Sequence, residues 1–342
     1  METELSNITG DIPGRPVPPE EEEKSPTPLQ DSLRRLRRDR RATLSLGFIS
    51  LLVTIAIFGP SIYQHIGGTY QSGSHETIGP EQYHSYDHQE WYREDELPSA
   101  QYWLGTDSSG RDILARLMQG LLVSLMVVIL VETLDIVLGT VVGVLAGYYG
   151  GWIDQLLARF TDIMFAFPSM LFLILLTGIF GGWADDNLSS IPMIGANGNA
   201  RLLLVASALA FTTWPMMARY VRGQTLQLKE QQFIEAAKAS GTSDARIIRH
   251  HIIPNLFSIV VVVATLDISG MIMNEAGISL LGLGVQAPGS SIGLMISAAI
   301  HDSIFTHPWE VLVPCVVLVI IVLAFSFFGD GLRDAFDPRS KD

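Results

Sequence analysis

The chain has 342 residues, of which 48% are apolar and 17% are charged. Its formal net charge of −13 argues against nucleic-acid binding as its main role, because that role needs a strongly basic surface. The single cysteine, Cys315, excludes an intrachain disulfide and a cysteine-based metal site.

Long apolar runs dominate the sequence and predict its fold class. Most are close to the roughly 20 residues that a helix needs to cross a bilayer core. We therefore predict an all-α, polytopic membrane protein with six transmembrane helices. The runs cover residues 44–62, 121–145, 163–180, 202–217, 256–281 and 311–328.

The N-terminal segment, residues 1–33, is acidic and rich in proline, and it has no apolar periodicity. We expect it to be a disordered tail. Six arginines between Arg34 and Arg41 then lie against the first apolar run, which has no evident cleavage site behind it. Segment 34–63 is therefore predicted to be a basic anchor at anionic headgroups and a retained first span, rather than a nucleic-acid site.

Residues 64–120 are predicted to form an external loop. It contains His84, Asp87 and His88, which could share a metal if they were helical, but a solvated loop is the favoured interpretation because no third ligand is specified. At its end, Asp107 can cap a turn and Arg111 can pair with a carboxylate. These two residues belong to the motifs Leu104-Gly105-Thr106-Asp107 and Gly110-Arg111-Asp112.

The remaining chain is expected to form a transmembrane core over residues 121–328 and a short tail over 329–342. A further outside loop near Asp185 and Asp186 is predicted to be solvated rather than to bind calcium.

Within the core, residues 219–255 form a polar stretch between two apolar runs. Good helix formers fill it up to Ser240, Gly241 is a natural left-handed helix stop, and Ser243 with Asp244 can begin a second helix. Pro254 is expected to end that second helix. We predict two short helices with a tight elbow.

The distribution of basic residues predicts the orientation of the spans. If the N-terminus lies inside, the inside segments carry 18 Lys and Arg and the outside segments carry 4. The positive-inside rule then places both termini and the stretch 219–255 in the cytoplasm.

The polar stretch carries a specific spacing: Glu235-Ala236-Ala237, three residues, Gly241, and an ending of the form Ile-x-Pro at Pro254. It resembles the cytoplasmic loop of permease subunits of binding-protein-dependent ABC importers, in particular the C-type permeases of the dipeptide, oligopeptide and nickel group. The resemblance covers residues 34–342 in order. Its other landmarks are the two motifs before the second span, the run 147–154, Ala166-Phe167-Pro168-Ser169, the run 280–285, Gly329-Asp330-Gly331 and Asp337-Pro338-Arg339.

The resemblance implies a type I ABC importer permease fold in a prokaryotic cell membrane. It also implies that the loop is a coupling helix, which docks into a groove of an ATPase subunit. The residues that would make or shape this contact are Glu235, Ala236, Ala237, Gly241, Ser243, Asp244 and Pro254.

The chain has no Gly-x-x-x-x-Gly-Lys-Ser/Thr loop, so we expect it to bind no cofactor and to catalyse no ATP hydrolysis itself. The resemblance implies two ATPase subunits or domains that hold ATP and Mg²⁺, a second permease that completes a heterodimer, an external solute-binding protein and a peptide substrate. A nickel importer of the same group is the alternative.

Several polar residues interrupt the apolar runs, where an ionised side chain costs several kcal/mol unless it meets protein or water. They could form a polar pathway for peptide termini, or they could be structural groups that are protonated or paired with another subunit. An ion-coupled carrier would also use such carboxylates, and a membrane scaffold would need only the spans and the loop. The residues are Glu132, Asp135, Asp267, Asn274 and Glu275.

Overall fold

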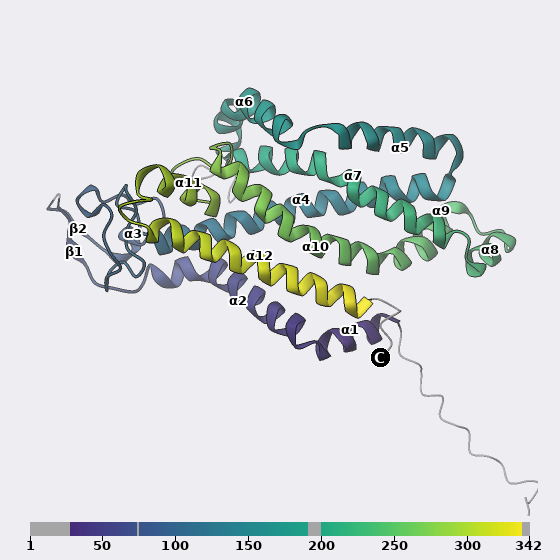
Figure 1. Cartoon of the computed structure of the whole chain (residues 1–342), viewed down its shortest axis with the longest axis horizontal. Coiled ribbons are helices and arrows are strands. Elements are labelled where there is room, and N and C mark those ends of the chain that lie inside the picture. The colour runs from purple at the N-terminus through teal and green to yellow at the C-terminus, as the bar shows by residue number, and fades with distance from the viewer. Residues whose placement is uncertain (1–27, 74, 191–199, 337–342) are drawn as a thin grey trace, which may run out of the picture.

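The computed structural model describes residues 28–73, 75–190 and 200–336. Residues 1–27 of the expected tail and the Asp337-Pro338-Arg339 motif lie outside this part of the chain, whereas residues 28–33, also expected to be disordered, are helical. Long helices run side by side, with a small lobe at one end and the short helices α8 and α9 at the other (Figure 1).

In the described residues, six helical segments are long and apolar enough to cross a membrane, which confirms the predicted number. One of them is continuous from Asp244 to Leu280 and joins three elements. The segments are α2 (Arg40–Tyr63), α4 (Ile113–Tyr149), α6 (Ser169–Leu188), α7 (Leu202–Leu228), the run of α9 (Asp244–Ile247), the π-helical turn η3 (Ile248–Ile252) and α10 (Ile253–Leu280), and α12 (Trp309–Phe336).

The third span begins later than its apolar run suggests. Helix α5 (Gly151–Ala166) ends before Phe167 and Pro168, and α6 starts at Ser169. Proline lacks an N–H and disfavours a helical conformation in the residue before it, so one apolar run is divided between two helices. At the N-terminal side, α1 (Pro28–Arg38) begins before the expected basic anchor, and Asp39 then caps α2 by accepting from the Arg41 N–H at 2.8 Å.

Helices α4 and α7 form the most extensive pair in the described residues. Their contact is made by Gly139, Gly143 and Gly147, which lie one helical turn apart on α4. A Cβ at Gly143 would lie 2.6 Å from the Ala218 carbonyl oxygen of α7, and one at Gly147 would lie 2.9 Å from the Arg222 carbonyl oxygen. The two backbones therefore approach each other as they do in small-residue seams of membrane helices.

The lobe at the end of the bundle opposite α8 contains short elements, and α11 (Ile292–Asp302) lies at the same end (Figure 1). The sequence analysis did not anticipate α11. The short elements of the lobe are the antiparallel strands β1 (Tyr70–Gln71) and β2 (Thr77–Ile78), the helix α3 (Pro80–Tyr83) and the 3₁₀ turn η1 (Trp91–Arg93).

The lobe is more ordered than the solvated loop that we predicted. His84 is 3% exposed, its Nδ1 lies 2.7 Å from the Asp112 carboxylate, and Asp112 caps α4 by accepting from the Leu114 N–H at 2.8 Å. Since α3 ends at Tyr83, His84 and His88 do not share a helix. The solvated-loop prediction is therefore wrong at His84, because its buried ring is bound to Asp112 at the start of α4.

The motifs before the second span are turns, as predicted. Asp107 accepts from the Ser109 N–H at 2.9 Å and pairs with the Arg111 side chain at 2.9 Å. Gly105 and Gly110 have positive φ, and a Cβ at either would lie within 2.2 Å of a backbone carbonyl oxygen. These two positions therefore require glycine for space as well as for conformation.

Candidate functional site

The polar stretch forms a separate tip at one end of the bundle, opposite the lobe (Figure 1). Helix α8 (Gln232–Ala239) is attached through Ile234, which is fully buried. Ile234 belongs to the same apolar cluster as Tyr148 of α4, Ile247 of α9 and Leu256 of α10. Ile234 therefore anchors α8 in an apolar cluster that α4 and α10 share.

Gly241 makes the predicted elbow. Its φ is +75°, its N–H donates to the Lys238 carbonyl at 2.9 Å, and the next N–H, of Thr242, donates to the Ala237 carbonyl at 3.1 Å. This is the left-handed ending by which glycine closes a helix. No atom lies within 4 Å of a Cβ built at Gly241, so the space beside the elbow is open in this chain.

The second helix starts as predicted but does not end as predicted. Ser243 occupies the position before α9 without a side-chain cap hydrogen bond, while the Asp244 carboxylate accepts from the Tyr148 hydroxyl at 2.7 Å. Pro254 does not end the helix, because it lies in the first turn of α10. The π-helical turn before it uses i to i+5 hydrogen bonds, so the chain passes the missing proline N–H and stays helical.

The outer face of α8 is small and accessible. Glu235 and Ala236 are exposed, and Ala237 is half-buried. Lys238 places its ammonium 5.4 Å from the centre of the Tyr148 ring, on the side toward α4. Because alanine side chains add little bulk, another protein surface could come close to the α8 backbone here.

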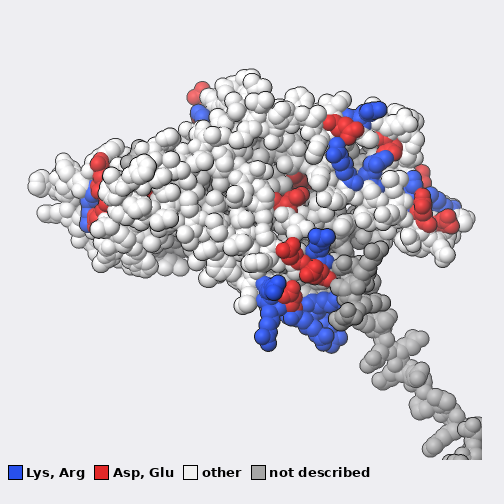
Figure 2. Space-filling view, viewed as in Figure 1, with Lys and Arg blue, Asp and Glu red and all other residues white. Residues whose placement is uncertain are grey.

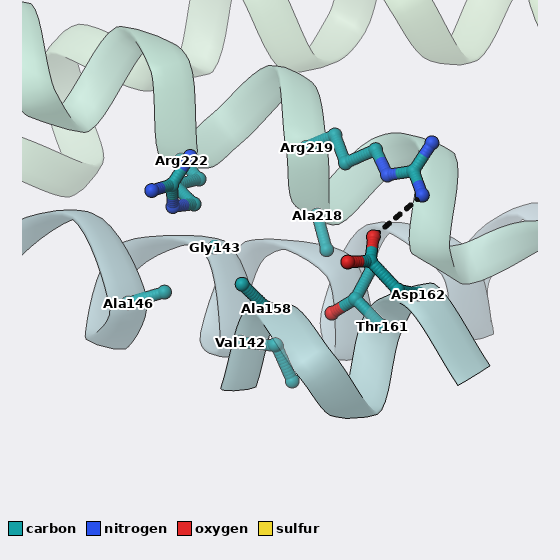
Figure 3. A pocket seen from close by; sticks show the side chains of 9 residues that line it. All are labelled: Val142, Gly143, Ala146, Ala158, Thr161, Asp162, Ala218, Arg219 and Arg222. Carbon is teal, nitrogen blue, oxygen red and sulfur yellow. Dashed lines mark hydrogen bonds and ion pairs between the residues drawn. The ribbon is translucent and has the colours of Figure 1, made fainter. Parts of the chain in front are cut away.

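Two ion pairs join α5 to α7 near this tip. Asp154 binds the Arg222 guanidinium through both oxygens, at 2.5 and 2.7 Å, and Asp162 binds Arg219 at 2.9 Å. The hydrogen bonds from Arg222 hold the pKa of the Asp154 carboxyl below its usual value. A cavity of about 380 Å³ lies between α4, α5 and α7, lined by Gly143, Thr161 and both arginines (Figure 3).

The polar residues of the apolar runs fall into two groups. Glu275 is 2% exposed and accepts hydrogen bonds from Ser124 of α4 at 2.7 Å and from Ser279 at 2.8 Å, whereas the neighbouring Asn274 is exposed. Glu275 therefore has the partners of a structural group that ties α10 to α4.

The second group is an acidic cluster formed by Glu132 and Asp135 of α4 and Asp267 of α10, which lie close enough to repel one another. Neither oxygen of Glu132 has a hydrogen-bond partner in the described residues. Asp267 is only partly buried, so this cluster reaches the surface of the single chain.

Sequence reasoning did not find the pairs Asp154–Arg222 and Tyr148–Asp244, because their members are 68 and 96 residues apart. The glycine spacing of α4 was visible in the sequence and would have indicated the close contact with a second helix.

Six helices long and apolar enough to cross a membrane, with the exposed tip of α8 at one end of the bundle, define a polytopic membrane protein. The comparisons with known proteins give the family. The family described as "Binding-protein-dependent transport system inner membrane component" matches residues 139–342, and "N-terminal TM domain of oligopeptide transport permease C" matches residues 27–76. The chain belongs to this family of ABC importer permeases, as the sequence resemblance implied.

Individual relatives extend over almost the whole chain. The dipeptide transport system permease protein DppC of Alkalihalophilus pseudofirmus is 36% identical over 95% of this chain and 94% of its own. The oligopeptide transport system permease protein OppC of Escherichia coli K12 is 38% identical over 91% of each chain. The glutathione transport system permease protein GsiD of Escherichia coli O6:K15:H31 is 36% identical over 92% of each chain.

Family membership makes this chain a multi-pass inner-membrane permease that acts with ATPase and substrate-binding partners and is not itself an enzyme.

Proposed function

We propose that this chain is one half of the translocation pathway of an ATP-driven importer of di- or oligopeptides. Three relatives that each cover more than nine-tenths of the chain are named for dipeptides, oligopeptides and glutathione, which is itself a peptide. The common feature of these substrates is a peptide backbone with charged termini.

The proposed coupling role rests on one observation: the exposed face of α8 lies beside Gly241, where no other part of the chain fills the space. An ATPase surface that closes on this face would push α8, and Ile234 would pass the displacement to α4, α9 and α10. Glu235 offers a charge to a basic residue of the partner. Ser243, Asp244 and Pro254 shape the turn into α10 rather than meet the partner.

The proposed complex has two ATPase subunits, a second permease and an external solute-binding protein, with ATP and Mg²⁺ held by the ATPases. Both termini and α8 face the cytoplasm. The acidic cluster of Glu132, Asp135 and Asp267 is the part of the polar pathway that would attract the ammonium group of a peptide, with Asn274 farther along α10. Glu275 supports this region through its serine contacts.

The test begins with affinity purification of the tagged chain from its native membrane in mild detergent, followed by mass spectrometry. Two ATPases with phosphate-binding loops, a second permease and a solute-binding protein are expected to co-purify. Vesicles reconstituted with the complex should then take up a labelled peptide only when ATP is present on the side of the ATPases and the solute-binding protein is present on the opposite side.

Uptake of Ni²⁺ instead of peptides would contradict the substrate proposal. Proton-driven uptake by the chain without ATPases would contradict the coupling proposal.

A further inference from the structure

Three potential metal ligands from separate parts of the chain meet at the outer end of the bundle. Asp95 lies after η1 in the lobe, His307 lies just before α12, and Glu310 lies in the first turn of α12. One ligand atom from each residue, a His nitrogen or a carboxylate oxygen, lies within 4.8 Å of the other two. These residues form no part of the coupling surface or the acidic cluster.

The Glu310 carboxylate is the central feature. Glu310 is 3% exposed, yet neither of its oxygens has a hydrogen-bond partner in the described part of the chain. Asp95 Oδ1 also lacks a hydrogen bond among the described residues, and His307 Nδ1 lies 3.3 Å from Asp95 Oδ2, an ion pair when the ring is protonated but without hydrogen-bond geometry. Buried polar atoms are nearly always satisfied, and a buried carboxylate needs a counter-charge or a proton.

No Lys or Arg of the described chain forms an ion pair with Glu310. Arg116 lines the same small cavity as Glu310, but its guanidinium faces Asp107 at 3.5 Å. Asp107 also pairs with Arg111 at 2.9 Å. Glu310 therefore faces a second acid, Asp95, and an imidazole, and these are the groups with which a metal cation would be shared.

We propose that Asp95, His307 and Glu310 bind a divalent transition-metal cation, with Zn²⁺ as the best match. One imidazole nitrogen and two carboxylate oxygens are an established ligand type for Zn²⁺, and three protein ligands leave a fourth position for water. Tetrahedral bonds of about 2.1 Å place ligand atoms about 3.4 Å apart. His307 Nδ1 and Asp95 Oδ2 are already 3.3 Å apart, whereas the three ligand atoms together lie only within 4.8 Å of one another. His307 and Asp95 have side chains that are 31% and 29% exposed, so both can move inward.

The consequence is a link between the lobe and the last membrane helix. Asp95 lies on the loop that leads into α4, whereas His307 and Glu310 position the start of α12. A bound cation would hold these two parts together on the outer side. This link does not depend on the proposed substrate or on the partner proteins.

The test uses the purified full chain in lipid nanodiscs, treated with EDTA, dialysed, and reloaded with Zn²⁺ alone. Elemental analysis should find one Zn²⁺ per chain, and Zn²⁺ should raise the Tm by several degrees because it binds only the folded state. Glu310→Gln and His307→Gln remove a ligand with little change in size. Loss of an outer-shell partner alone weakens metal binding about 10- to 100-fold, so loss of a ligand should weaken it by more.

His301→Gln is the matched control, because His301 is an exposed histidine on α11 at the same end of the molecule. It should keep the metal and the Tm shift. Zn²⁺ binding that persists in both Glu310→Gln and His307→Gln would overturn the proposal. A wild-type chain that binds no Zn²⁺ would overturn it as well, and a higher Tm for Glu310→Gln would then identify Glu310 as a protonated acid.

Discussion

At the scale of single residues, a substitution at Gly241 should affect the proposed contact with the ATPase more than it affects the stability of the chain. A side chain at φ +75° costs on the order of 1 kcal/mol, and nothing in the chain would clash with it. We expect Gly241→Val to insert and fold but to lower ATP-driven peptide uptake at least about tenfold, which a loss of about 1.4 kcal/mol in docking would produce. Uptake by reconstituted complexes measures this.

Two variants control that experiment. Gly241→Asn tolerates the left-handed conformation and should retain more uptake than the valine variant. Gly223→Ala alters an exposed glycine of α7 that also has no neighbour within 4 Å, and it should transport normally. Normal uptake by Gly241→Val would remove the support for the coupling role.

The ion pair of Asp154 and Arg222 gives a prediction on pH. The pKa of Asp154 is lowered in the folded chain by hydrogen bonds from Arg222, so the pair stabilises the fold above the unfolded carboxyl pKa, which is about 3.9. That contribution is lost as the pH falls through the lower, folded pKa. The difference in Tm between the wild type and Asp154→Asn should therefore be full at pH 6 and shrink below about pH 4.

Asp162→Asn is the comparison for this measurement, because Asp162 and Arg219 are 57% and 43% exposed and such pairs contribute little. A Tm difference for Asp154→Asn that stays constant down to low pH would show that the ion pair is not the cause.

At the scale of elements, the glycine seam of α4 sets how closely α7 can approach. Gly143→Ala places a methyl group 2.6 Å from the Ala218 carbonyl oxygen, and such overpacking typically costs about 1–3 kcal/mol. We expect a clear fall in Tm in nanodiscs. Gly182→Ala in α6 meets no atom within 4 Å and should leave the Tm unchanged or slightly higher, as an alanine does in an open helical position. Equal Tm values for both variants would contradict the close contact.

The elements that the sequence predicted are those with a strong local signal. Apolar length gave the number of spans, and Gly241 gave the elbow, because both effects act within one segment. Pro254 was interpreted wrongly because a helix can absorb a proline in its first turn, and the π-helical turn that precedes it has no sequence signature. The boundary at Pro168 was not predicted, because the apolar run 163–180 was treated as one span although proline disfavours a helical conformation in the residue before it.

The long-range parts of the sites could not be predicted from the sequence. His84 contacts Asp112, and Asp244 accepts a hydrogen bond from Tyr148; neither contact follows from local spacing. The cluster joins Asp95 to His307 and Glu310, which lie more than 200 positions later in the chain, so the fold alone brings them together. The same holds for Glu132 and Asp267, which were predicted separately and share one cluster.

At the scale of the whole molecule, charge is distributed unevenly along the long axis. Lys and Arg gather over α1, near the ends of α5 and α7 that lie toward α8, and at the α8 tip, while few lie at the end with the lobe (Figure 2). Basic residues concentrate on the cytoplasmic side of membrane proteins, so this asymmetry predicts that α8 is cytoplasmic and the lobe is external. The acidic cluster lies near the middle of α4 and α10, between these two ends, as the proposed polar pathway requires.

The orientation can be tested by cysteine labelling. In a Cys315→Ser background, one variant carries Ser240→Cys at the end of α8 and another carries Glu81→Cys on α3 of the lobe; both positions are exposed. A membrane-impermeant maleimide should label Glu81→Cys on intact cells or right-side-out vesicles, because only the external face is reachable there. It should label Ser240→Cys only in inside-out vesicles, and detergent should expose both. The reverse pattern would place α8 outside, where no ATPase could reach it, and would refute the coupling proposal together with the orientation.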